Sequence, residues 1–231
     1  MRPIRCISPA GWPWSGDDPP RKVLFDDTAI GLRIEVERHV PENRMPLESG
    51  DAWVEALVLP WKSSDQAPVA SYVRLRPEAT WIAGSGEPFD LLRCSYRGSF
   101  RERAGLNDLA PKHDSTVLKP YPGLSLEEIE RRLPQEAGAR TTRLFRTPSK
   151  QLITTLLEGD PGWQLEEHAH STDVASICVG GGGTLTAGDD TWLREPFQAA
   201  LIPAGASHAF VAGPTGVSLF IVVFPAGTLR G

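Results

Sequence analysis

Short runs of apolar and β-branched residues, separated by turn-forming residues, recur along most of the chain. The intervening stretches are rich in proline and glycine, of which the chain has 21 and 22. Runs of this length and composition, bounded in this way, are typical of β-strands. The strand candidates are residues 30–40, 53–61, 70–76, 89–96, 150–158, 174–179, 199–204 and 217–224. The pattern predicts an all-β protein.

One segment, GLSLEEIERRLP, has the pattern of a helix instead. Ser125 and Glu128 have the spacing of a capping box, and Pro134 ends the helix. We therefore expect one short helix at about residues 126–133. It lies in a polar stretch without a strong strand pattern, so we expect residues 101–148 to be a linker between two β units.

The two halves of the chain repeat the same order of strands and turns. In the C-terminal half, LEEHAHSTDVASICV is followed by ALIPAGASHAFVAGPTGVSLFIVVF, and in the N-terminal half MPLESGDAWVEALVL is followed by RLRPEATWIAGSGEPFDLLRCSY. The aligned pairs are Glu48 with His168, Gly50 with His170, Pro77 with Pro203 and Ile82 with His208. We interpret this as a duplicated β unit whose first copy lacks the histidines, with a chance match of two β-rich halves as the alternative.

Composition limits the partners that the protein can have. The formal net charge of −5 over 231 residues argues against a nucleic-acid partner. No apolar run approaches the roughly 18–20 residues that a membrane span needs, and the N-terminal residues lack the apolar segment of a signal peptide. The three cysteines, Cys6, Cys94 and Cys178, form no CxxC pair. We therefore expect a cytoplasmic protein with reduced thiols.

Two histidines stand one residue apart in GWQLEEHAHSTDVASICV. In a strand His168 and His170 would point to the same face, close enough to hold one metal ion. His208 follows a Pro-Ala-Gly-Ala-Ser turn that can bring a later strand beside the first. Three imidazoles inside a small barrel would leave positions on the ion open for water or substrate. The HxH pair alone is weak evidence, because a histidine in a strand is more often structural.

The longer pattern resembles the two signature motifs of the cupin superfamily. It consists of Gly162, five residues, His168-x-His170, then Gly180, then Pro203-x-Gly205-x-x-His208. The resemblance implies a jelly-roll-type β-barrel in which His168, His170 and His208 bind a divalent metal ion. With the repeat, it implies an all-β bicupin of two such barrels joined by a linker with one short helix. Its parts would be residues 1–100, a degenerate barrel without metal ligands; the linker 101–148; and residues 149–231, the metal-binding barrel.

Within this superfamily, ICVGGGGTLT and IVVFPAG resemble the second cupin of the bacilysin-pathway bicupin isomerase. That resemblance covers roughly the C-terminal third of the chain. It implies an enzyme that moves a double bond in an arylpyruvate-like precursor.

The chain departs from the family pattern at two positions. Cupins usually supply a glutamate four residues after the second histidine, where this chain has Val174. Asp173 is adjacent, but strand alternation would turn it away from the histidines unless a bulge intervenes. Ala212 replaces an asparagine often found after the last histidine. We therefore expect three neutral imidazoles as the ligands, with a role for Asp173 or Glu166 left open.

A divalent ion held by neutral ligands keeps its full charge, so the site should favour a small anionic, chelating substrate. An enolate, a 2-oxo or 2-hydroxy acid and a thiolate all fit this description. Open positions would allow O2 to bind beside the substrate, or the ion to polarise a carbonyl. Fe(II) is the favoured ion, with Zn, Ni, Mn or Co as alternatives.

Other residues near the motif are candidates for the pocket. Gln164 and Glu166 share the parity of His168, so we expect them to face the barrel interior. Glu166 is the candidate general base, or a partner that orients an imidazole, although a solvated position at the barrel mouth fits equally. The other candidate pocket residues are Val174, Cys178 and Phe210. A cysteine in a position like that of Cys178 more often fills space in the core as a small apolar residue, and Phe210 could equally belong to the hydrophobic core.

The four glycines at 180–183 lack the Lys-Ser/Thr of a phosphate-binding loop, so we expect a tight turn there. His39 and His113 lie outside both motifs and are expected at the surface.

Three functions remain open at this point. The first is an Fe(II) oxygenase or dioxygenase. The second is a metal-dependent isomerase or cyclase of a biosynthetic pathway, and the third is a small-molecule-binding bicupin without catalysis. A barrel whose histidines only pack in the core is a further alternative. Exposed strand edges would favour a homodimer, although no residue identifies its interface.

Overall fold

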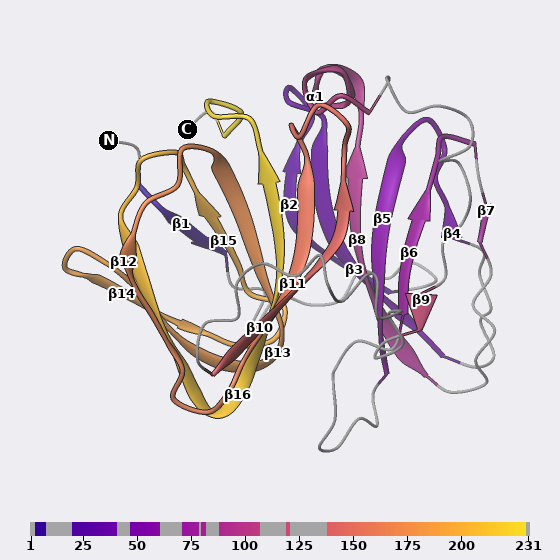
Figure 1. Ribbon diagram of the computed structural model, residues 1–231. Coiled ribbons are helices and arrows are strands. Elements are labelled where there is room, and N and C mark those ends of the chain that lie inside the picture. Colours follow the sequence, from indigo (N-terminus) through magenta and orange to yellow (C-terminus); the bar gives the residue numbers. More distant parts are fainter. Residues whose placement is uncertain are drawn as a thin grey trace. The chain divides into compact units, whose positions relative to one another are not determined.

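The computed structural model describes residues 3–7, 20–40, 47–60, 71–78, 80–81, 88–106, 119–120 and 138–229. The chain divides into two compact units, which are considered separately. One unit contains residues 1–8 and 125–231, and the other contains residues 9–124. Both consist of antiparallel β-sheet, coloured by sequence in Figure 1. The all-β prediction is confirmed.

The C-terminal unit contains one eight-stranded sheet. Its strands are β1 (Arg5–Ile7), β10 (Ala139–Arg146), β11 (Ile153–Gly159), β12 (Gln164–His168), β13 (Asp173–Ala187), β14 (Asp190–Arg194), β15 (Ala199–Ile202) and β16 (His208–Phe224). The order is β1-β15-β13-β16-β11-β10, with β12 paired to β16 and β14 paired to β13. Every pairing is antiparallel. The pairs β10–β11 and β13–β14 join consecutive strands, as antiparallel hairpins do.

Two long strands, β13 and β16, pair along most of their lengths and carry the sheet around the barrel (Figure 1). Their register shifts twice, between Cys178 and Gly180 and between Gly181 and Gly183. Bulges of this kind bend a strand and increase its twist, which lets one sheet close on itself. The run of glycines is therefore part of a continuous strand, and the predicted tight turn is wrong.

The backbone packing explains why these positions are glycine. A Cβ atom on Gly181 would lie 2.2 Å from the carbonyl oxygen of Gly216, and one on Gly183 would lie 2.3 Å from that of Val211. Gly181 also has a φ angle of +63°, which side chains disfavour. The close approach of β13 to β16 thus depends on the absence of side chains.

The interior of this unit is apolar. Trp163, Val174, Leu185, Phe210 and Leu219 are among the buried residues of its core, and Trp163 and Phe210 lie with ring centroids 6.4 Å apart. This core supports the strands that carry the histidines.

The N-terminal unit has a six-stranded sheet and a separate two-stranded pair. Its elements are β2 (Arg21–Asp27), β3 (Leu32–His39), β4 (Leu47–Glu48), β5 (Trp53–Pro60), β6 (Ser71–Leu75), β7 (Thr80–Trp81), β8 (Phe89–Tyr96), α1 (Gly98–Arg103) and β9 (Lys119–Pro120). The order in the larger sheet is β2-β3-β8-β5-β6-β9, and β4 pairs with β7. In the sequence repeat, β4 aligns with the end of β12, and β7 aligns with residues 206–207, directly before β16.

His39 is buried in this unit, and its expected surface position is wrong. Its ring stacks on Phe89 with centroids 4.8 Å apart, and its Nε2 atom lies 3.4 Å from a carboxylate oxygen of Glu37. Arg93 donates a 3.2 Å hydrogen bond to Glu37. The histidine therefore belongs to a buried polar cluster with Glu37 and Arg93.

The structure places several segments differently from the sequence prediction. All eight predicted strand segments coincide with observed strands, wholly or in part. However, β1, from the expected first barrel, pairs with β15 of the C-terminal unit, and β10 lies inside the expected linker. The predicted helix at 126–133 and His113 lie outside the described residues.

Among the described residues, no helix is long and apolar enough to cross a membrane.

Candidate metal centre

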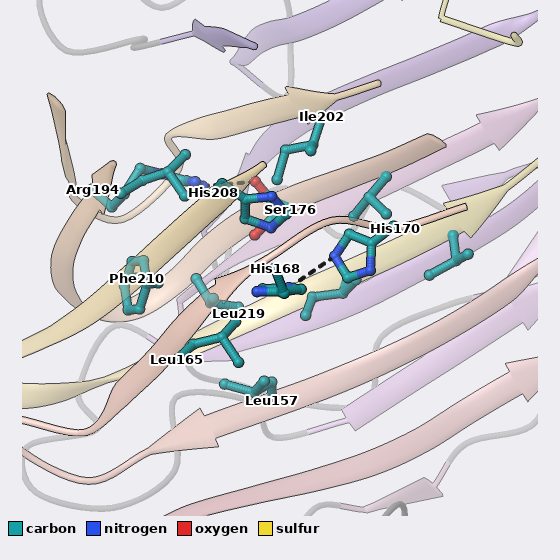
Figure 2. A pocket seen from close by; sticks show the side chains of 14 residues that line it. Leu157, Leu165, His168, His170, Ser176, Arg194, Ile202, His208, Phe210 and Leu219 are labelled. Carbon is teal, nitrogen blue, oxygen red and sulfur yellow. Dashed lines mark hydrogen bonds between the residues drawn. The ribbon is translucent and has the colours of Figure 1, made fainter. Parts of the chain in front are cut away.

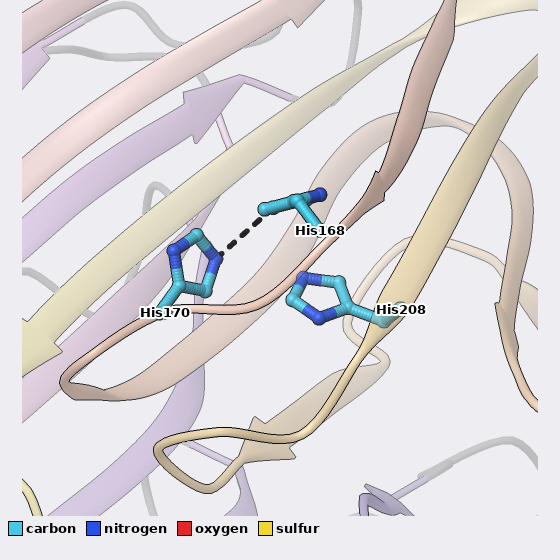
Figure 3. Close-up of side chains that lie close together, drawn as sticks. All are labelled: His168, His170 and His208. Carbon is cyan, nitrogen blue, oxygen red and sulfur yellow. Dashed lines mark hydrogen bonds between the residues drawn. The ribbon is translucent and has the colours of Figure 1, made fainter.

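Three histidines meet where β12 ends and β16 begins (Figure 3). His168 is the last residue of β12 and pairs directly with His208, the first residue of β16. His170 follows two residues later. One ring nitrogen from each of the three lies within 4.8 Å of the others. Within the described residues, this is the only group of three or more His, Cys, Asp or Glu side chains close enough to share an ion.

Backbone carbonyls orient two of the imidazoles. The Nδ1 atom of His168 lies 2.8 Å from the carbonyl oxygen of Glu166, and that of His208 lies 3.1 Å from the carbonyl oxygen of Ala206. A carbonyl only accepts, so each Nδ1 carries the proton and donates it. The Nε2 atoms of His168 and His208 then carry no proton, as metal binding requires.

The distances between the rings fit one shared ion. The Nε2 atoms of His168 and His170 are 3.2 Å apart, and the ring centroids of His168 and His208 are 4.3 Å apart. With metal–nitrogen bonds of about 2.0–2.1 Å, two adjacent ligand atoms on one ion lie about 3 Å apart. The residues present therefore fit a metal ion.

Burial favours the neutral form of two of the imidazoles, those of His170 and His208. Burial, followed by the neighbouring His168 and His208, lowers the pKa of His170 to about 4. Burial also lowers the pKa of His208, despite the opposing effect of its hydrogen bond to the Ala206 carbonyl. Neutral imidazole is the form that binds a metal ion.

Asp173 has a different role from that of a ligand. Its side chain is buried, and its two carboxylate oxygens accept hydrogen bonds from the backbone N–H groups of Ala204 (2.8 Å) and Leu229 (2.7 Å). The N–H of Gly205 donates to the carbonyl of His170. Asp173 and His170 therefore hold the turn that leads into His208.

A cavity of about 320 Å³ opens beside the histidines (Figure 2). Its polar lining residues are the three histidines, Ser176 and Arg194. The remaining lining residues are apolar: Leu157, Leu165, Val174, Leu185, Ile202, Phe210, Leu219, Ile221 and Val223. The volume is at the lower end of the range for small-molecule sites. Val174 and Phe210 thus lie where the sequence placed them.

The predicted inward direction of Gln164 and Glu166 is wrong. Both side chains are exposed, and the residue between them, Leu165, lines the cavity. The register of β12 against β16 shifts between Leu165 and His168. A bulge inserts one residue and reverses the alternation of side chains. Only the backbone carbonyl of Glu166 contacts the histidine group.

Cys178 is fully buried in the core of the unit and is not among the residues that line the cavity. Its Sγ lies 3.5 Å from the carbonyl oxygen of Gly180. The prediction that it faces the pocket is therefore wrong, and its alternative role as apolar filler fits. Arg194 and Ser176, which the sequence interpretation missed, occupy the polar part of the lining instead.

No family model matches the chain, and a search of curated proteins finds no match either. Solved structures do resemble it. A 7S globulin from Momordica charantia has a TM-score of 0.61 at 12% identity, with 93% of this chain and 81% of that chain covered. A salicylate 1,2-dioxygenase from Pseudaminobacter salicylatoxidans has a TM-score of 0.54 at 10% identity, with coverage of 84% and 71%.

A cupin 2 conserved barrel domain protein from Leptotrichia buccalis has a TM-score of 0.50 at 12% identity, with 88% of each chain covered. At such low identity these likenesses show the fold alone. The chain has the all-β fold of cupin-domain proteins, with two jelly-roll-type barrels.

Proposed function

We propose that the C-terminal barrel is a mononuclear metal-dependent enzyme acting on a small anionic metabolite, with Fe(II)-dependent oxygenase chemistry as the favoured reaction. The observation that carries the proposal is the convergence of three histidine nitrogens within 4.8 Å at the edge of a cavity. A dioxygenase among the similar structures supports the reaction class.

The ligand set argues for an anionic substrate. The three imidazoles carry no negative charge, and no carboxylate lies in the described group. A divalent ion bound there would retain its charge and supply Lewis acidity, and iron would also supply the redox capacity that O2 chemistry needs. Two adjacent oxygen or sulfur donors on the substrate would complete the coordination.

The chain's own residues perform the remaining tasks. The carbonyls of Glu166 and Ala206 fix the ring orientations of His168 and His208, so the ligands are placed before an ion arrives. The apolar walls exclude water from the part of the substrate that is not coordinated, which strengthens the polar interactions that remain.

Metal analysis and oxygen uptake test this proposal. The wild type, purified without chelator, should contain about one equivalent of metal per chain, whereas His208→Ala should contain almost none. His39→Ala is the matched control, because His39 lies in the other unit and outside the histidine group. The iron-loaded wild type should then consume O2 with enolisable or 2-hydroxy acids. Absence of metal after reconstitution with each divalent ion would refute the proposal.

The second candidate is an isomerase or cyclase in which the ion only polarises a carbonyl. The sequence resemblance to the bacilysin-pathway isomerase favours it. Turnover without O2 consumption, supported by a redox-inactive ion such as Zn(II), would select this reaction.

A third candidate is a bicupin that binds small molecules without catalysis. The similar structures include a 7S globulin as well as a dioxygenase, so the fold does not imply an enzyme. Stoichiometric ligand binding with no product formed by the metal-loaded protein would select this function.

A further inference from the structure

A buried arginine shares the cavity with the histidines. Arg194, the last residue of β14, is only 2% exposed and lines the same cavity as His168, His170 and His208. Figure 2 shows its side chain reaching from β14 toward Ser176. Its position in a mainly apolar wall calls for an explanation, because arginine is almost never fully buried without a partner.

Only part of the guanidinium is hydrogen-bonded. Nη2 donates to the backbone carbonyls of Ser176 (2.7 Å) and Gln198 (2.9 Å). Nε is enclosed and has no hydrogen-bond partner. Nη1 makes no hydrogen bond to any described residue. Three of the five N–H donors of the group are therefore unused, whereas buried polar groups are normally satisfied.

The positive charge of Arg194 is also uncompensated. No carboxylate among the described residues forms an ion pair with it. The ionisable groups that act on it electrostatically are the thiols of Cys6 and Cys178. Burial raises the pKa of Cys178 to about 11, so this thiol is neutral at physiological pH. A guanidinium keeps its proton in a protein, so the cavity contains a net positive charge.

A purely structural role accounts for only part of these observations. The two carbonyl contacts of Nη2 tie β14 to β13 and to the turn before β15. They do not explain why the other donors and the charge lack a partner in a cavity lined mainly by aliphatic side chains. An anion in that cavity would supply the missing charge and an acceptor for Nη1, whereas Nε is enclosed by the protein.

We propose that Arg194 binds a carboxylate, or a planar anion of similar shape, of a ligand whose apolar body lies against the cavity wall. Leu157, Leu219 and Phe210 belong to that wall. A cavity of about 320 Å³ accommodates one aromatic ring or a branched aliphatic chain with its polar groups. Where the proposed enzyme function holds, this ligand is the substrate, and the histidine group takes its other polar end. The identification of this ligand as the substrate rests on the proposed function, whereas the carboxylate site does not.

Matched acids and amides provide the test. Benzoate, phenylacetate and 3-phenylpropanoate are titrated calorimetrically beside benzamide, phenylacetamide and 3-phenylpropanamide, which have the same shapes without the charge. We expect at least one acid to bind the wild type more than tenfold more tightly than its amide. In Arg194→Met this preference should disappear, and in Arg194→Lys it should be reduced. Arg146→Met is the control, because Arg146 is an exposed arginine in the same unit.

A second measurement is made on the wild type, with a variant needed only to assign one resonance. In wild-type protein labelled with ¹⁵N-arginine, the acids should shift an Nε–H resonance that the amides leave in place. Arg194→Lys, which retains the charge, assigns that resonance. In the chelator-treated protein, equal binding of every acid and its amide to the wild type, or an acid preference that persists in Arg194→Met, would overturn the proposal.

All titrations are done on chelator-treated and on zinc-loaded protein. An Arg194-dependent acid preference in the metal-free protein supports the carboxylate site even if the histidines bind no metal. Metal binding without such a preference supports the proposed metal centre and overturns the carboxylate site. The failures of the two proposals are therefore distinguishable.

Discussion

Replacing Asp173 with alanine tests whether this residue supports the histidine group or joins it. The carboxylate is 1% exposed and accepts two backbone N–H groups at 2.7–2.8 Å, from Ala204 and Leu229. A hydrogen bond to a charged group contributes about 1.5–3 kcal/mol. Because the two bonds share one carboxylate and water can enter after truncation, we expect Asp173→Ala to lower the free energy of unfolding by about 3–5 kcal/mol.

Urea denaturation followed by circular dichroism measures this loss. Asp189→Ala is the matched control, because Asp189 is exposed in the turn before β14 and should change the stability by less than about 0.5 kcal/mol. Asp173→Asn retains one acceptor but points an N–H₂ group at the other backbone N–H. It should therefore be destabilised as well, although the shape of the side chain is conserved.

The metal content of the same variants separates the two roles. If Asp173 positions the turn before His208, the folded fraction of Asp173→Ala still binds about one equivalent of metal, with lower affinity. An Asp173→Ala protein as stable as Asp189→Ala but unable to bind metal would refute the reasoning and make Asp173 a ligand.

Three further predictions concern the same unit. Gly183→Ala should lower the free energy of unfolding, measured by urea denaturation, by about 3 kcal/mol or more, because its Cβ would lie 2.3 Å from the Val211 carbonyl oxygen. Gly188→Ala is the control. Its Cβ meets no atom within 4 Å, so it should lose only about 1 kcal/mol for its positive φ. The lowered pKa of His170, about 4, means that below pH 6.5 the unfolded chain binds a proton that the folded protein does not. The urea midpoint of the metal-free protein should therefore fall from pH 6.5 to 4, and fall less in His170→Gln. Glu166→Ala should leave metal content unchanged, because only the backbone carbonyl of Glu166 contacts the histidines; a loss of metal would place its side chain in the site.

The histidine group could be predicted from the sequence because the spacing of its two motifs resembles that of the cupin superfamily. His168 and His170 are separated by one residue, and the turn before His208 contains the proline and glycine that reverse the chain. The structure brings the three together as expected. The group also depends on one long-range strand pairing, in which His168 lies opposite His208. The motif spacing already implied that the two strands meet there.

The neighbours of the histidines were less predictable because a bulge carries no reliable sequence mark. QLEEH reads as a regular strand, so alternation places Gln164 and Glu166 with His168. The register shift after Leu165 instead turns the leucine inward. Within this irregular stretch the Glu166 carbonyl lies 2.8 Å from the Nδ1 atom of His168. The side chain of Glu166 thus lies outside the pocket, while its backbone orients a histidine of the group.

The alternation that places Arg194 inside the barrel is present in the sequence, but the short segment that contains it was not recognised as a strand. DTWLR is short and polar at both ends, so it did not stand out as a strand. In the structure, Trp192 packs against the core, and Arg194 has the same parity. Alternation therefore places the guanidinium inside, where an unpaired charge costs free energy. Because the cavity lining contains this cation and three histidines but no acid, the proposed ligand is an anion from outside the described residues.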